Sequence, residues 1–266
     1  MEPSLPGEGA WQPDVGATVG GRAAIYTTEL RPAAGTPAAG IAWMDSAAAT
    51  VSLYAGTSEP NGIWPQQANV AAAEQPGLLA GFNSGFKIYS YRTGWYDHGV
   101  TAMSLQAGAA SFVIFADGTA TVAAWGRDVT MGPNVVAVRQ NLTLLVDGGV
   151  AASTVASYRL WGAVLHGGAQ TWRSGIGVTA GRDLVYVGGP GLDPAALAQL
   201  LIAAGAVRAM ELDINPEWVS FSLFAHAGGA AGAPITAASN LLPTMYLRAG
   251  HYLEPFSRDF FAVFAR

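Results

Sequence analysis

Short apolar runs that alternate with turn signals recur along most of the chain, and they constrain the fold more than any other feature. Three stretches share this form and carry glycine at the turn: SFVIFADGTATVAAW (111–125), NLTLLVDGGVAA (141–152) and GIGVTAGRDLVYVGG (175–189). In the first, Asp117-Gly118 stands where a two-residue hairpin turn needs positive φ. Because hairpins pair their strands antiparallel, the pattern predicts a largely antiparallel sheet rather than a purely βαβ architecture.

Two stretches have the composition of helices. PQQANVAAAEQ (65–75) begins with a proline and stops before Pro76-Gly77. In DPAALAQLLIAAG (193–205), Asp193 suits the N-cap, Pro194 the first helical position and Gly205 the position just past the end. We therefore predict an α+β fold, with a mixed, largely antiparallel β-sheet core built from hairpins and a few packed helices. No shift in composition divides the chain, so we expect a flexible N-terminal arm over 1–20 and one domain over 21–266.

The composition excludes several classes of protein. Hydrophobic residues make up 51% of the 266 residues and charged residues 12%, which is the opposite of a disordered chain. The net charge of −5 disfavours a nucleic-acid partner, because such proteins need basic surface. Without cysteine there are no disulfides and no thiol nucleophile. No apolar run is long enough to cross a bilayer, so we expect no transmembrane segment.

The acids of one predicted strand stand out because charge is scarce. In MELDIN (210–215), side chains alternate between faces, so Glu211, Asp213 and Asn215 share one face while the apolar residues take the other. Carboxylates two residues apart can act as a catalytic acid and base when their surroundings separate their pKa values. The alternative is structural: one acid forms an ion pair with an arginine, and the other lies at a solvated strand end.

Two loops add further candidates. RTGWYDHG (92–99) contains Arg92, Asp97 and His98 beside aromatic residues suited to a sugar ring, although it could equally be an exposed turn. HGGAQTWRSGIG (166–177) places His166 and Arg173 before a strand. An arginine there could bind a phosphate or carboxylate through two hydrogen bonds, or it could simply neutralise one of the acids of the preceding paragraph.

The bend GFNSGFK (81–87) contains Lys87, the sole lysine of the chain. Its ammonium could face a substrate phosphate, or it could serve only solubility at the surface. No Walker A loop, dinucleotide-binding glycine pattern, HExxH zinc motif or GxSxG nucleophile elbow is present in the sequence.

The order of these motifs resembles the phosphodiester glycosidase domain family, from about residue 80 to about 220. GFNSGFK (81–87) resembles that family's Asn-Gly-Gly-Phe-like bend, and WRSGIGV (172–178) resembles its Arg-Thr-Ala-Ile-Gly-like strand. GLDPAALAQLLIAAGAVRAMELD (191–213) resembles its helix and the strand that leads to an acid. The pattern differs after Asp213, where the family's glycine run is replaced by INPEW (214–218), so Asn215, Glu217 and Trp218 contribute side chains there.

The resemblance implies hydrolysis of a sugar-1-phosphodiester or a related glycosidic bond, and by position it assigns Asn83, Arg173 and Asp213 to the site. We expect one carboxyl to act as general acid and another as base or nucleophile, with Asp213 and either Glu211 or Asp97 as the pair. Arg173 and Lys87 would hold an anionic leaving group. It implies a carbohydrate or glycan-phosphate substrate from a bacterial cell envelope or from extracellular glycans. We therefore expect a secreted or envelope-associated bacterial protein whose export signal lies outside this sequence. No cofactor is predicted with certainty, and a divalent metal held by acids and Asn stays open. The alternatives are a non-catalytic carbohydrate-binding domain of the same fold and a divalent-metal phosphoesterase.

Overall fold

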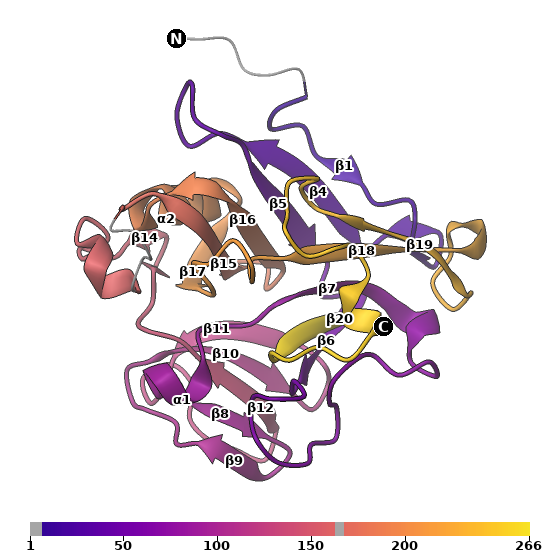
Figure 1. Cartoon of the computed structure of the whole chain (residues 1–266), viewed down its shortest axis with the longest axis horizontal. Helices are drawn as coiled ribbons and strands as arrows, with labels where there is room; N and C mark the ends of the chain where they lie inside the picture. Colours follow the sequence, from indigo (N-terminus) through magenta and orange to yellow (C-terminus); the bar gives the residue numbers. More distant parts are fainter. Residues whose placement is uncertain (1–6, 163–167) are drawn as a thin grey trace.

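The computed structural model describes residues 7–162 and 168–266, which form three antiparallel sheets and a two-stranded ribbon (Figure 1). The largest sheet has eight strands in the order β1-β4-β5-β16-β15-β17-β13-β14. In that order the strands are Gln12–Pro13, Ile25–Leu30, Ala39–Met44, Leu184–Leu192, Thr171–Thr179, Ala206–Glu211, Val146–Asp147 and Val150–Ala151.

The other two sheets have five strands each. One has the order β11-β10-β12-β8-β9, formed by Ala120–Ala124, Ala110–Phe115, Val135–Gln140, Trp95–Asp97 and Val100–Met103. The second has the order β19-β18-β7-β20-β6, formed by Ile235–Asn240, Phe221–His226, Leu78–Asn83, Phe260–Ala265 and Ala49–Tyr54. The ribbon pairs β2 (Thr18–Val19) with β3 (Arg22–Ala23).

The predicted hairpins are confirmed. β10 and β11 pair across Asp117-Gly118, where Gly118 has a φ of 78°. β15 and β16 pair from Val178↔Leu184 outward, although the positive φ at their turn is that of Arg182 rather than of glycine. β13 and β14 form a shorter hairpin than 141–152 suggested. The prediction of a largely antiparallel sheet core therefore holds.

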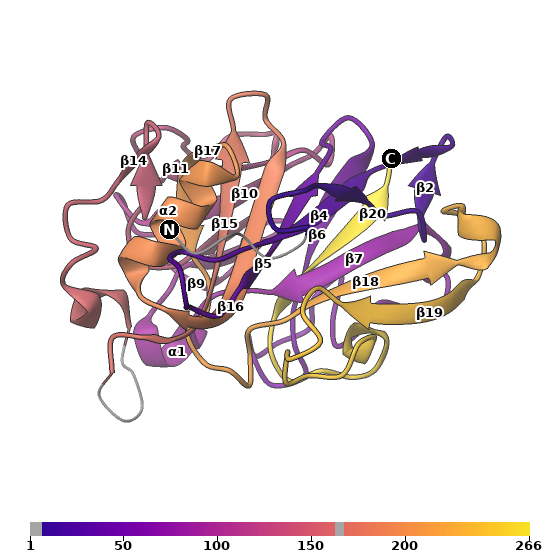
Figure 2. The same cartoon turned by 90° about the horizontal axis from the view of Figure 1, so that it is seen from above.

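The helix predicted from residue 193 is also confirmed. α2 covers Pro194–Ala203, and the Asp193 carboxylate caps it by accepting the Ala196 N–H at 2.8 Å. Gly205 follows with a φ of 95°, a conformation that glycine adopts without strain. Figures 1 and 2 show α2 packed against one face of the eight-stranded sheet. Leu197 and Leu201 point into the apolar layer between them.

The helix predicted over 65–75 is wrong. Only the 3-10 turn η1 (Gln75–Gly77) forms at its end, and the remainder is irregular. The Gln67 side chain donates to the Gly56 and Gly62 carbonyls, and Ala68 donates its N–H to the Ala55 carbonyl. The Ala68 N–H is thereby paired outside the segment, whereas a helix would have paired it internally.

The fold is consequently closer to mainly-β than to the predicted α+β class. Besides α2, the described residues contain one α-helical turn, α1 (Ile88–Tyr91), and the 3-10 turns η2 (Tyr158–Trp161), η3 (Ala227–Gly229) and η4 (His251–Leu253). Within 7–162 and 168–266, no helix has the length and apolar character needed to span a bilayer. In the stretch expected to be an arm, β1 pairs with β4.

One large core joins the three sheets. Phe82 on β7, Phe112 on β10, Tyr186 on β16 and Phe261 on β20 are all buried in it, and the Phe82 ring contacts the other three. The Phe82–Phe261 centroids lie 5.2 Å apart. This packing fixes β7, β16 and β20 against one another, and the candidate site lies where the chain leaves β7 and enters β20.

Candidate functional site

A cavity of about 210 Å³ opens where the chain leaves β7 and β17 and enters β20. It is lined by Phe86, Lys87, Tyr91, Asp213, Ile214, Asn215, Trp218 and Arg258. The lining thus combines one carboxylate, two cations and three aromatic rings. Four of these side chains were predicted from the sequence as site residues: Lys87, Asp213, Asn215 and Trp218.

Asp213 lies just beyond the last residue of β17 and is 5% exposed. Its Oδ1 accepts the backbone N–H groups of Ile214 at 2.8 Å and of Asn215 at 3.0 Å. Its Oδ2 is the oxygen that approaches Arg258. Burial raises the pKa of this carboxyl to about 6, and Arg258 together with the two backbone N–H groups limits the rise. Asp213 can therefore change its ionisation near neutral pH, as an acid or base in catalysis must.

Asn83 holds the backbone of Asp213 in place through the hydroxyl of Ser174. Its Nδ2 donates to Ser174 Oγ at 3.0 Å, and the same hydroxyl accepts the Asp213 N–H at 3.2 Å. The Oδ1 of Asn83 accepts from Tyr186 Oη at 2.9 Å and from the Ser220 N–H at 3.1 Å. The amide is thus committed to protein partners on both sides, so Asn83 orients the acid rather than lining the cavity.

Arg258 connects Asp213 to a second acid. Its Nη2 donates to the Gly85 carbonyl at 2.9 Å and lies 3.5 Å from Asp213 Oδ2, while its Nε lies 3.4 Å from Glu59 Oε2. The guanidinium also lies over the Trp218 ring, 5.0 Å from its centroid. Both acids face one planar cation, and Arg258 is itself 7% exposed. Their charges are therefore coupled in a poorly solvated place.

The loop that presents Glu59 depends on a close backbone contact. Thr57 and Ser58 donate their N–H groups to the carbonyls of Phe256 and Ser257. A Cβ on Gly56 would lie 2.3 Å from the Ser257 carbonyl oxygen, far closer than any real contact. A residue without a side chain is therefore required where this loop meets the residue before Arg258.

A second buried ion pair supports the floor of the site. Arg139 on β12 and Asp259 are joined at 2.6 Å between Nε and Oδ2, with both side chains fully buried. Ser84 Oγ donates to the same Asp259 oxygen at 2.5 Å. Arg139 also donates to the Phe86 carbonyl at 2.6 Å and to Thr93 Oγ1 at 2.7 Å. It thereby fixes the 84–93 segment, which carries Lys87 and Tyr91 into the cavity.

Glu211 and Arg173 form a third buried pair. The Arg173 Nη1 contacts Glu211 Oε1, and the guanidinium also donates to the Leu192 and Trp161 carbonyls at 3.0 Å each. Both side chains are fully buried, and neither lines the cavity with Asp213. Burial raises the pKa of Glu211, and the guanidinium of Arg173 opposes that rise. This arrangement is the structural alternative noted for the sequence.

Other predicted residues lie elsewhere. Asp97 and His98 line a separate cavity beside β10 and β12, with His98 Nδ1 2.6 Å from Asp97 Oδ1. Arg92 is exposed at the end of α1 and borders a third cavity. Glu217 is exposed, and its N–H bonds to Asn215 Oδ1 at 3.0 Å. His166 lies outside the described residues.

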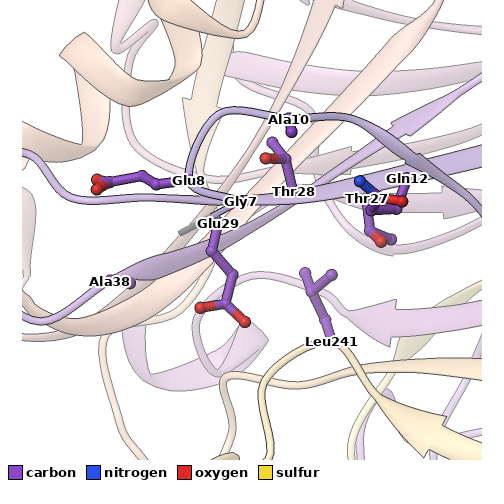
Figure 3. A pocket seen from close by; sticks show the side chains of 9 residues that line it. All are labelled: Gly7, Glu8, Ala10, Gln12, Thr27, Thr28, Glu29, Ala38 and Leu241. Carbon is purple, nitrogen blue, oxygen red and sulfur yellow. The ribbon is translucent and has the colours of Figure 1, made fainter. Parts of the chain in front are cut away.

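The metal left open by the sequence finds no site in the described part of the chain. Over 7–162 and 168–266, no group of three or more His, Asp or Glu side chains is arranged to hold an ion. A larger cavity of about 330 Å³ lies between residues 7–12 and β4 (Figure 3). Glu8 and Glu29 contribute to its lining, but no predicted site residue does.

Sequence reasoning missed Arg258, Glu59, Arg139, Asp259 and Ser174. Arg258 and Asp259 follow the region in which motifs were recognised, and no local pattern relates them to Asp213. Arg139 did leave a signal, because it ends the otherwise apolar run VVAV (135–138). A buried arginine requires an acidic partner, so the position of Arg139 marks it as a candidate site residue.

Comparison with known proteins supports the fold. No protein-family model and no curated protein matches the chain. Among solved structures, the chain is similar to the catalytic domain of zebrafish N-acetylglucosamine-1-phosphodiester α-N-acetylglucosaminidase, a structure described as auto-inhibited by its pro-peptide. The TM-score is 0.52 at 13% identity, covering 100% of this chain and 96% of that one. A hypothetical protein from Synechocystis gives a TM-score of 0.50 at 12% identity, covering 93% of this chain and 63% of that one. The resemblance noted in the sequence is confirmed at the level of the fold.

Proposed function

We propose that the protein is a glycoside hydrolase that cleaves a sugar-1-phosphodiester, with Asp213 as the reacting carboxylate. The observation that carries the proposal is the meeting of Asp213, Arg258 and Lys87 with the rings of Trp218 and Phe86 in one cavity. Aromatic faces suit the apolar face of a sugar, and two cations suit the phosphate bonded to its anomeric carbon. The enzyme-like fold of the zebrafish domain supports the same reaction class.

The charge arrangement fits this substrate better than an ordinary glycoside. Hydrolysis of a glycoside between two sugars uses two carboxyl groups, one of which protonates the leaving oxygen. A phosphate already carries negative charge at neutral pH and can leave as an anion if cations stabilise it. A single carboxylate beside Arg258 and Lys87 is then sufficient, with ionised Asp213 acting as base toward water or as nucleophile at the anomeric carbon.

Glu59 is the candidate for a second carboxylate if one is used. Both acids contact Arg258, at 3.4 and 3.5 Å, so one guanidinium holds their facing oxygens within about 9 Å of each other. That limit is compatible with the spacing of paired glycosidase carboxylates, about 5–9.5 Å. Glu59 also accepts the Tyr89 N–H at 3.2 Å, which holds it at the edge of α1.

The proposal is tested by assaying sugar release. UDP-N-acetylglucosamine, nitrophenyl glycosides and bacterial cell-wall glycans are incubated with the wild-type protein and with Asp213→Asn. We expect release from the phosphodiester substrate, with most of the rate lost in the variant. No release from any of these substrates, or an equal rate in the variant, would contradict the proposal.

A carbohydrate-binding domain without turnover is the second candidate. Among the described residues, Asp213 is the sole carboxylate that lines the cavity. If the sugar is bound but not cleaved, the same incubations release nothing, while calorimetry detects binding that is lost in Trp218→Ala. No observation favours the divalent-metal phosphoesterase.

A further inference from the structure

A second cavity rich in aromatic residues lies at the other end of α2 from Asp193. It has a volume of about 390 Å³ and is lined by Trp11, Arg22, Tyr26, Trp43, Asp45 and Ala204. We call it the Trp43 groove. Its residues come from the segment before β1, the ribbon strand β3, the paired strands β4 and β5, the residue after β5 and the C-cap of α2. None of them belongs to the site around Asp213.

The aromatic wall of the groove follows from strand register. Tyr26 on β4 and Trp43 on β5 are direct cross-strand partners, so their side chains emerge on the same face. Their ring centroids lie 5.6 Å apart at an interplanar angle of 65°. Neither ring is fully buried, and Trp11 is 40% exposed beside them. The groove therefore offers ring surface to solvent, although Ile25 on β4 and Ile41 on β5 are buried.

Polar groups without protein partners accompany the rings. Asp45 uses Oδ1 to accept the Ala47 N–H at 2.8 Å, which orients the carboxylate and leaves Oδ2 available. Within the described part of the chain, the Arg22 guanidinium and the indole N–H groups of Trp11 and Trp43 have no hydrogen-bond or ion-pair partner. The groove thus presents donors, one acceptor oxygen and aromatic faces together.

We propose that the Trp43 groove is a glycan-binding site that is separate from the Asp213 cavity. A pyranose ring has one face of C–H groups, which packs on the negatively charged face of an aromatic ring, and a rim of hydroxyls. Carboxylate and guanidinium groups at the edge can bind neighbouring hydroxyls, the carboxylate as acceptor and the guanidinium as donor. The volume falls within the range of small-ligand sites, about 300–1,000 Å³. A purely apolar partner would bury Asp45 Oδ2 and the Arg22 guanidinium without hydrogen-bond partners.

The placement makes this groove an anchoring site rather than part of the reacting centre. α2 has 10 residues and so separates its two ends by about 15 Å. Arg173 and Asp193 lie toward the Asp213 end, whereas Ala204 and Trp43 lie at the other. Holding one part of a long glycan here would raise the concentration of its other parts near the protein. This inference does not depend on turnover at Asp213.

The test uses the ¹⁵N-labelled full chain titrated with chitohexaose, cellohexaose and maltohexaose. The indole N–H signals of the eight tryptophans are assigned with single Trp→Phe variants, each of which lacks one signal. We expect at least one of these hexasaccharides to shift the signals of Trp11 and Trp43 in a saturable way. Trp11→Ala and Asp45→Ala should each weaken that binding at least tenfold.

Trp218→Ala is the matched control, because it removes an indole from the other cavity and should leave the titration of Trp11 and Trp43 unchanged. Because Trp11 is exposed, Trp11→Ala is expected to leave the core intact. The test therefore does not depend on whether a Trp43 variant folds. The proposal is overturned if none of the three hexasaccharides shifts these two signals, or if Trp218→Ala abolishes the shifts. Loss of phosphodiester hydrolysis in Asp213→Asn with these titrations intact would separate the two sites.

Discussion

The Arg258 guanidinium lies 3.5 Å from Asp213 Oδ2, and it counteracts the effect of burial on that carboxyl. Burial favours the protonated acid, while the cation favours the ionised one. The ionisation of Asp213 is therefore set by a balance between two large effects, and changing either one should be measurable.

Asp213→Asn should abolish most of the proposed hydrolysis. The amide cannot accept a proton from water or attack the anomeric carbon, and loss of such a group lowers kcat by roughly 10²–10⁴-fold. Release of sugar from a phosphodiester substrate measures this. Glu29→Gln removes an exposed carboxylate elsewhere and serves as the control. Equal losses in both variants would point to a general charge effect rather than to chemistry at Asp213.

The pH profile should shift in a defined direction when Arg258 is replaced. If Asp213 reacts in its ionised form, the wild-type rate rises with pH through about 6. Arg258→Gln removes the cation that lowers this pKa, so the rise should move to higher pH, and KM for the phosphodiester should increase. Rates measured from pH 4.5 to 9 test this. A profile that moves to lower pH would show that Asp213 does not control the reaction.

Asp213 should also make the fold less stable as pH increases. Its pKa in the folded protein is about 6, above the ordinary value of 3.8, so the folded state binds a proton that the unfolded chain releases first. The resulting stability is complete below about pH 3.8 and is lost as the pH rises through 6, a difference of about 3 kcal/mol. In Asp213→Asn this contribution is absent. Denaturant unfolding at pH 4 and pH 8 should show the variant gaining on the wild type at pH 8.

Glu211 should prove structural. Glu211→Gln leaves Arg173 buried without its counter-charge, and breaking such a pair destabilises a protein by about 3–5 kcal/mol. The double variant Arg173→Met with Glu211→Leu should recover part of that loss. Thermal unfolding and kcat are measured together. A stable Glu211→Gln protein with strongly reduced kcat would instead support the catalytic role expected from the sequence.

Lys87 should affect binding without affecting stability. Its side chain is exposed at the start of α1 and lines the Asp213 cavity. Lys87→Gln is expected to raise KM for a phosphodiester several-fold, because one phosphate contact is lost, while the melting temperature is unchanged. Lys87→Arg should restore most of the affinity. Unchanged kinetics in Lys87→Gln would identify the residue as a surface lysine that serves solubility.

The parts of this molecule that sequence reasoning predicted are those determined by neighbours in the chain. The hairpin at Asp117-Gly118 and the capped helix after Asp193 depend on local turn and cap chemistry. The helix predicted over 65–75 failed because Gln67 and Ala68 bond to residues ten or more positions away. Local propensity cannot anticipate such contacts.

The same distinction applies to the site. Asp213 and Trp218 lie together within one short segment, so reading that segment was enough to propose them. Asp97 was proposed because it lies in a loop with His98 and aromatic residues, yet β8 places it beside a different cavity. Arg258 is brought to Asp213 by the packing of two sheets, because β17 and β20 belong to different ones, and no short motif encodes that packing. Glu59, the other acid beside Arg258, lies farther still from Asp213 in the chain.

The central position of β20 has a consequence for how the protein is made. This strand lies between β6 and β7, both of which precede it by most of the sequence, and residues 258–259 lead directly into it. During synthesis, β6 and β7 must therefore wait with unpaired edges until β20 emerges from the ribosome. Asp213 gains its counter-charge at the same late moment. A nascent chain would thus be prone to aggregation until that strand is inserted.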